Sequence, residues 1–322
     1  MKKKITVMTL ILVIAVVTLG GCKAKKDLDI SKYSYPDLSA EGWTETMNVD
    51  FSTIKTMDDL NAAKWFSSKH GLRNEEYWCP SAITFGDDGV VIKSEIKENH
   101  VCADGLCPAS GIFTGGIETR IDKGDGTFDN VFSQAFGYFE TTVRVPSGTG
   151  MWSAFWLQSD DVGRIGDKGR DGSEIDIYES SFRENPTMTG NAVHYDAYSW
   201  PWYQSHGKVT DTGLNLYEGF HSYGLLWTPD EYVFFVDGKP VWATAFGGVS
   251  RVEEILRLTV EIRTGGVGPY GQNIGQFQNR DDGSNDFIIK SVRVYQNDAY
   301  KPAVKTYENG FMQDLLGKIK IG

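Results

Sequence analysis

One short stretch decides how this chain is interpreted: GSEIDIYES, residues 172–180. Acidic and apolar residues alternate along its first half, which is the pattern of a β-strand with one polar face and one buried face. Glu174 and Asp176 share the polar face, and Ile175 and Ile177 share the apolar one. Glu179 lies an odd number of residues after Glu174, so regular alternation would place its carboxylate on the apolar face. An unpaired charge buried there would be strongly destabilising.

A β-bulge near Ile177 and Tyr178 would remove this conflict. An extra residue in one strand resets the alternation, so that Glu179 rejoins Glu174 and Asp176 on one concave face. The two glutamates then lie about four regular steps, or roughly 13 Å, apart along the strand. Their side chains could lean together to the separation of about 5–5.5 Å that retaining glycosidases use.

This arrangement suits the cleavage of a glycosidic bond by two carboxyl groups. One attacks the anomeric carbon and the other protonates the leaving oxygen, so their pKa values must differ. We assign Glu174 as the nucleophile, Asp176 as the residue that orients and tunes its neighbours, and Glu179 as the general acid/base. The alternatives are a solvated acidic face or a calcium loop, but such a loop would require Glu where the chain has Tyr178.

The segments around this stretch predict one all-β domain over residues 43–297. Its 36 glycines indicate many turns between short strands, and a two-sheet antiparallel jelly roll would leave few open edges. Residues 57–63 are expected to form one short helix, whereas 307–321, in the C-terminal tail 298–322, fit an amphipathic helix or an extra strand. The expected strands are 90–95, 115–120, 137–145, 150–158, 174–179, 190–195, 221–227, 231–236, 256–262 and 287–295.

The N-terminus has the pattern of a secretory signal. Three lysines precede an apolar run over 7–19, and Leu19-Gly20-Gly21-Cys22 resembles a bacterial lipobox. The resemblance implies a signal peptide over 1–22, diacylglycerol on Cys22, and a polar tether over 23–42. We therefore expect a lipid-anchored protein at the cell surface, outside the cytoplasmic membrane or on the outer membrane.

The net charge of the chain limits the classes of molecule that it could bind. The formal net charge of −11 argues against nucleic acid, whose phosphates require a basic surface. We expect a monomer that needs no cofactor for catalysis. Cys79, Cys102 and Cys107 remain after Cys22, and their odd number leaves any disulfide pairing open.

Residues 174–179 resemble the E-x-D-x-x-E signature of glycoside hydrolase family 16, in its laminarinase-like branch with a bulge. The similarity extends from Trp43 to Gln296 and implies a concanavalin-like jelly roll that hydrolyses a polysaccharide with retention of configuration. It rests on further motifs: GYFE at 137–140, GMWSAFWL at 150–157, FHSYGLLWTPD at 220–230 and VRVYQ at 292–296.

The resemblance also implies binding residues. The family's sugar-stacking tryptophan falls on Trp152, with Trp156 in the same motif, and its histidine on the next strand falls on His194. Arg73 and Asn74 lie in a segment similar to one at the cleft rim. Family members often carry a structural calcium ion away from the cleft, for which Asp286, before the last strand, is the candidate ligand.

Two departures concern the substrate. Ser153 stands where the family usually has Pro, and the aromatic segment 194–203 replaces a short glycine-rich stretch. We interpret Trp200, Trp202 and Tyr203 as sugar platforms. The leading hypothesis is an endo-β-1,3- or mixed-linkage β-1,3-1,4-glucanase. The alternatives are a hydrolase of agar-like galactans, a transglycosylase, and a non-catalytic glycan-binding surface protein.

Overall fold

The computed structural model describes residues 27–101, 105, 107–263 and 265–307. The expected signal peptide, Cys22, Cys102 and residues 308–322 lie outside this range, so lipidation and the form of the tail's end stay predictions. Within the described ranges, no helix has the length and apolar character needed to span a membrane.

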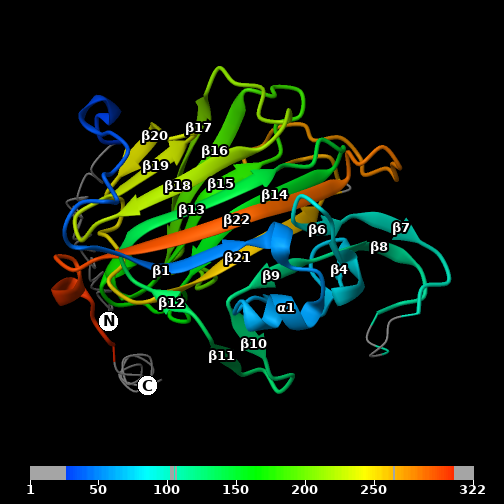
Figure 1. Cartoon of the computed structure of the whole chain (residues 1–322), viewed down its shortest axis with the longest axis horizontal. Helices are drawn as coiled ribbons and strands as arrows, with labels where there is room; N and C mark the ends of the chain where they lie inside the picture. Colours follow the sequence, from blue (N-terminus) through cyan, green and yellow to red (C-terminus); the bar gives the residue numbers. More distant parts are fainter. Residues whose placement is uncertain (1–26, 102–104, 106, 264, 308–322) are drawn as a thin grey trace, which may run out of the picture.

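Two large antiparallel sheets form the domain and lie face to face (Figure 1), which confirms the expected sandwich. In the first sheet, β1 (Trp43–Asp50) also pairs with β22, and the strand order is β20 (Lys239–Thr244), β19 (Tyr232–Val236), β18 (His221–Trp227), β13 (Gly137–Arg144), β22 (Asp286–Asn297), β6 (Val90–Lys93) and β5 (Ile83–Phe85). In the second sheet, β12 (Ser133–Gln134) also pairs with β21, and the order is β17 (Gln204–Asp211), β16 (Met188–Tyr195), β15 (Ser173–Ser180), β14 (Met151–Gln158), β21 (Glu254–Ile262), β9 (Gly116–Glu118) and β2 (Phe66–Ser67).

Smaller elements flank the sandwich. The expected short helix is present as α1 (Met57–Ala62), and the Thr56 side chain accepts the N–H of Asp59 at its start. Single turns of 3-10 helix occur at Ile30–Lys32, Phe51–Thr53, Pro80–Ala82, Lys168–Asp171 and Lys301–Ala303. A small sheet contains β3 (Gly71–Leu72), β4 (Glu76–Trp78), β8 (Gly111–Thr114) and β7 (Glu95–Lys97), and a separate hairpin contains β10 (Arg120–Asp122) and β11 (Phe128–Asn130).

The core lies between the two large sheets. Ile175 and Ile177 of β15 are fully buried in it, as the alternation predicts. Tyr178 from the second sheet stacks on Tyr223 from the first, with ring centroids 4.1 Å apart. Burial of this apolar surface is the main force that holds one sheet on the other.

The predicted bulge is present in β15. In the pairing with β14, Tyr178 and Asp176 face consecutive residues, which leaves Ile177 as the extra residue. Ile177 and Tyr178 both belong to the core and neither is exposed. The next residue, Glu179, therefore returns to the face that carries Glu174 and Asp176, so the conflict seen in the sequence is resolved as expected.

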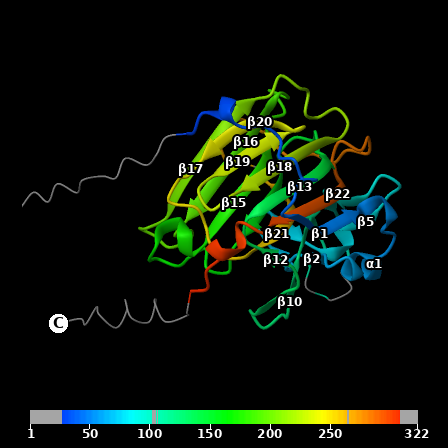
Figure 2. The ribbon, with the colours of Figure 1, turned by 60° about the vertical axis from the view of Figure 1, so that its left-hand side comes forward.

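Residues 27–42, expected as part of a tether, lie against the first sheet instead. The backbone N–H of Leu28 donates to the carbonyl of Ala243 at 2.8 Å, and the Tyr33 hydroxyl donates to Glu231 at 2.7 Å. Leu28 and Tyr33 also pack on buried side chains of that sheet. Figure 2 shows the segment, in blue, passing β20 on its way to β1. The folded domain thus begins before Trp43, because these apolar side chains cover its outer face.

Cys79 and Cys107 lie in the small flanking sheet and its loop. They are close enough for a side-chain hydrogen bond, and neither is in a disulfide in this structure. Since Cys102 is outside the described residues, the pairing of the three cysteines stays open.

Candidate active site

A cleft with a volume of about 580 Å³ lies over the second sheet. Its floor consists of the side chains that alternate with the core residues of β14, β15, β16 and β21. Loops before β4, after β16 and after β21 form its walls. Among the residues that line it are Arg73, Asn74, Trp152, Trp156, Glu174, Asp176, Glu179, His194, Tyr198, Tyr203, Glu261, Arg263 and Tyr270.

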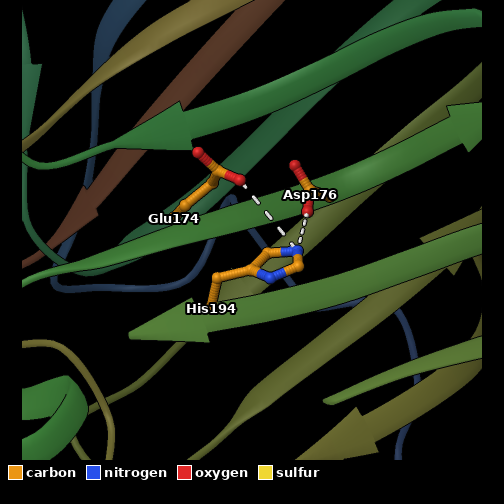
Figure 3. A group of neighbouring side chains, drawn as sticks. All are labelled: Glu174, Asp176 and His194. Carbon is orange, nitrogen blue, oxygen red and sulfur yellow. Dashed lines mark hydrogen bonds and ion pairs between the residues drawn. The ribbon is translucent and has the colours of Figure 1, made fainter. Parts of the chain in front are cut away.

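Three acids from β15 and a histidine from β16 form the centre of the cleft. Strand pairing places Glu174 directly opposite His194. The His194 Nε2 atom lies 3.0 Å from the Asp176 Oδ2 atom and 4.0 Å from the Glu174 Oε1 atom (Figure 3). Glu179 and Asp176 are 4% and 6% exposed, so both carboxyl groups are largely withdrawn from water. The bulge thus brings all three acids into one cleft.

Both ring nitrogens of His194 contact neighbouring side chains. Its Nδ1 atom lies 2.7 Å from the hydroxyl oxygen of Tyr203, and the two rings stack nearly parallel. Burial by itself lowers the pKa of His194, but the hydrogen bond to Asp176 and the negative charges of Asp176 and Glu174 together raise it to about 10. The imidazole is therefore protonated at neutral pH and places a positive charge beside Glu174.

Two tyrosines each donate a hydrogen bond to one glutamate. Tyr198, in the loop after β16, donates its hydroxyl to Glu174, and Tyr270, in the loop after β21, donates to Glu179. Glycine makes room for the second contact, since a Cβ atom at Gly190 would lie 2.2 Å from the Tyr270 ring. Neither tyrosine could be assigned to the site from its place in the sequence.

The environments of the two glutamates differ. Burial raises the pKa of Glu174 to about 7 and the charge of Asp176 adds to the effect, while His194 and Tyr198 oppose it. Burial raises the pKa of Glu179 to about 8, again with Asp176, and Tyr270 opposes it. Because the protonated His194 lies beside Glu174, we infer that Glu174 ionises first and that Glu179 keeps its proton near neutral pH.

Comparison with known proteins agrees with this geometry. Residues 109–246, which include all three acids, match the family model described as "Glycosyl hydrolases family 16". The segment that carries the three acids therefore belongs to glycoside hydrolase family 16.

Similar proteins show how far the likeness extends. "Endo-1,3-1,4-beta-glycanase EglC" from Rhizobium meliloti is 26% identical over 277 residues, which cover 80% of this chain and 52% of that protein. "Beta-glucanase" from Rhodothermus marinus is 34% identical over 110 residues, covering 33% of this chain and 36% of that protein. The chain thus spans about half or less of these curated relatives. The solved structure of SCLam, described as a non-specific endo-beta-1,3(4)-glucanase from family GH16, has the same fold, with a TM-score of 0.59 and 22% identity over 85% of this chain and 95% of that one.

The family motif predicts two tryptophans in the cleft, Trp152 and Trp156. Both line it, but they differ in solvent exposure. Trp152 is partly exposed, and the guanidinium of Arg263 lies 5.1 Å from its ring centroid. Trp156 is only 5% exposed, and its Nε1–H donates to the Thr259 hydroxyl at 3.0 Å. We therefore expect Trp152 to offer the stacking surface and Trp156 to form part of the fixed wall.

Arg73 and Asn74 lie at the cleft, as predicted, and both bind the same acid. The Arg73 Nε atom lies 2.8 Å from one carboxylate oxygen of Glu261, and the Asn74 side-chain amide donates to the other. Glu261 comes from β21, in which every residue is buried, so its sequence pattern resembles core. This shared acid fixes the β3–β4 loop at the edge of the cleft.

The predicted aromatic platforms separate into two groups. Tyr203 lines the cleft through its contact with His194, whereas Trp200 and Trp202 do not belong to the lining. Trp200 is 87% exposed and Trp202 is 47% exposed. A role for these two tryptophans within the cleft itself is therefore not supported.

Asp286 is the calcium ligand that the family resemblance implies. The positive charges of Lys93 and Arg144 act on Asp286 and disfavour a bound cation, while the negative charge of Glu95 acts in the opposite direction. In the part of the chain that the structure describes, the group of three side chains with metal-ligand spacing is Glu174, Asp176 and His194 rather than any set around Asp286. The residues described around Asp286 thus give no support to a calcium site there, and the calcium ion stays a prediction.

Proposed function

We propose that this chain is a retaining endo-β-glycosidase that hydrolyses a β-1,3- or mixed-linkage β-1,3-1,4-glucan. The observation that carries the proposal is the bulge in β15, which brings Glu179 into the cleft beside Glu174 and Asp176. The unequal electrostatic surroundings of the two glutamates supply one ionised and one protonated carboxyl group, as this reaction requires.

In the proposed reaction the ionised Glu174 attacks the anomeric carbon while Glu179 gives its proton to the glycosidic oxygen. The bond between that carbon and oxygen breaks, and the sugar remains as an ester of Glu174. Glu179, now ionised, takes a proton from a water molecule whose oxygen attacks the same carbon and releases Glu174. Two inversions at one carbon give overall retention.

Asp176 and His194 have supporting roles in this scheme. Asp176 lies between the two glutamates along β15, and its negative charge raises the pKa of both. The protonated His194 fixes the position of the Asp176 carboxylate through a 3.0 Å hydrogen bond. Its positive charge also stabilises the ionised form of Glu174. Together they hold the two carboxyl groups in different protonation states while keeping them on one face.

The names of the relatives favour a glucan. Endo-1,3-1,4-β-glycanase and β-glucanase activities belong to proteins that this chain resembles over part of their length. A galactan is the second candidate, because "Beta-porphyranase B" from Zobellia galactanivorans is 30% identical over 152 residues, which cover 43% of this chain and 51% of that protein.

Incubation of the purified domain with laminarin, barley β-glucan, lichenan or agarose, followed by a reducing-end assay, tests the proposal. We expect new reducing ends from at least one of the three glucans, and none after Glu174→Gln or Glu179→Gln. Circular dichroism and thermal melting would show that both variants remain folded. Cleavage of agarose alone would replace glucan by galactan, and full activity of either Gln variant would contradict the assigned roles.

We further propose that Cys22 carries the lipid that attaches the enzyme to the cell surface. The basic start, the apolar run over 7–19 and the small residues before Cys22 support it. Metabolic labelling with a radioactive fatty acid should mark the full-length protein and fail to mark the Cys22→Ala variant. Equal labelling of both would contradict the proposal.

A further inference from the structure

An exposed aromatic surface lies next to the cleft, in the loop after β16. Trp200 and Trp202 are 87% and 47% exposed, although buried or partly buried positions are usual for tryptophan. Tyr198 and Tyr203, at the two ends of the same segment, line the cleft. The aromatic surface is therefore continuous with the proposed active site along the chain.

The loop that carries these rings is held in place by hydrogen bonds. The Ser199 hydroxyl donates to the carbonyl of Gly163 at 2.8 Å, and the N–H groups of Trp202 and Tyr203 both donate to the carbonyl of Ser199. The side chain of Tyr198 is held at the acid Glu174. A ligand that binds this loop would lose little free energy to ordering it.

The chemistry of the loop favours a neutral ligand with flat apolar faces. Residues 197–203, AYSWPWY, contain no charged side chain. One face of a β-linked pyranose ring presents mainly C–H groups, which pack on the face of an indole, while the ring hydroxyls stay in water. Trp200 follows Tyr198 by two residues, so their Cα atoms are at most about 7.6 Å apart. A polysaccharide that leaves the cleft past Tyr198 would thus reach Trp200 at once.

We propose that Trp200 and Trp202 form a second carbohydrate-binding platform, outside the catalytic cleft, that holds the part of a neutral β-linked polysaccharide extending beyond it. This inference rests on the proposed function, because the occupant is the same polymer. Its consequence is a dependence on substrate length. A long chain contacts both the cleft and the platform, whereas a short oligosaccharide occupies the cleft alone.

Kinetics on two substrates of different length test the platform. The double variant Trp200→Ala/Trp202→Ala should raise KM for polymeric barley β-glucan about tenfold, with kcat unchanged. Hydrolysis of a mixed-linkage β-glucan tetrasaccharide should stay within about twofold of the wild type. Ile121→Ala, which removes an exposed apolar side chain from the separate β10–β11 hairpin, is the control and should change neither. Equal losses on both substrates, or no loss on the polymer, would overturn the proposal.

A binding assay separates this inference from the proposed activity. The Glu174→Gln variant, with and without the two tryptophan substitutions, is run through native gels that contain barley β-glucan, laminarin or agarose. The platform predicts that a retarded band moves faster when both tryptophans are replaced, whichever polymer is bound. If the wild type hydrolyses no polymer, the proposed function fails while this readout remains. If retardation is the same with and without the tryptophans, the platform fails while the activity can stand.

Discussion

Replacing Tyr270 by phenylalanine should shift one limb of the pH–rate profile. The substitution removes the hydroxyl that donates to Glu179 and keeps the ring, which packs over Gly190 and against Phe182. The hydroxyl stabilises the ionised form of Glu179, so its loss raises the pKa of that carboxyl group. Glu179 must be protonated to act as an acid, and activity in the wild type should therefore fall as pH rises through about 8.

The size of the shift follows from the energy of the lost contact. A hydrogen bond to a charged group contributes about 1.5–3 kcal/mol, and about 1.36 kcal/mol corresponds to one pKa unit. The pKa of Glu179 should thus rise by roughly one to two units. Water that enters the open cleft would replace part of the lost hydrogen bond, so the rise should be nearer to about one unit. The basic limb of kcat/KM should move upward by about this amount, to near pH 9.

The matched control is Tyr198→Phe. Tyr198 donates to Glu174, which must be ionised to attack, so the loss of its hydroxyl should move the acidic limb upward from about pH 7 and leave the basic limb in place. The assay is kcat/KM on the best glucan from pH 5 to pH 10. A basic limb that does not move in Tyr270→Phe, or two variants that shift the same limb, would refute the assignment of one tyrosine to each glutamate.

Three further substitutions give separate tests. Gly190→Ala should lower kcat/KM by roughly ten- to a hundredfold, because the new Cβ would lie 2.2 Å from the Tyr270 ring and displace it; an unchanged kcat/KM would contradict this packing. His194→Ala should move the acidic limb to higher pH, because it removes the positive charge beside the nucleophile; a shift to lower pH would contradict the sign. Glu118→Gln should lower the free energy of unfolding, measured in urea, by about 3–5 kcal/mol. The Glu118 carboxylate lies 2.7 Å from buried Arg257, and the substitution leaves this arginine without that charge partner. A loss below about 1 kcal/mol would show that the pair is dispensable.

The sequence was most informative where a local rule would otherwise be violated. The spacing of Glu174 and Glu179 would bury a charge in a regular strand, and only an extra residue between them avoids that cost. The bulge at Ile177 could therefore be predicted from nine residues. Most other strands of the sandwich could be predicted from short apolar or alternating runs between turns, whereas β1, β17 and β20 were not among the expected strands.

The missed parts of the site depend on long-range contacts. Tyr270 meets Glu179 across 91 residues, from a glycine-rich loop with no periodic pattern. Glu261 lies in a strand buried on both sides, so only its partners Arg73 and Asn74, from a distant loop, show that it faces the cleft. The polar composition of residues 23–42 predicts a tether, because it outweighs the few apolar side chains that contact the sheet.

Identification of the residue that becomes bonded to the sugar would show whether Glu174 is the nucleophile. The wild-type enzyme is incubated with a 2-deoxy-2-fluoro β-glucoside carrying a dinitrophenyl leaving group, which slows release of the covalent intermediate, and its peptides are sequenced by mass spectrometry. We expect one glycosyl group, attached to Glu174. A glycosyl group on Glu179 or Asp176, or release of an α-configured product from a β-linked substrate without any adduct, would contradict it.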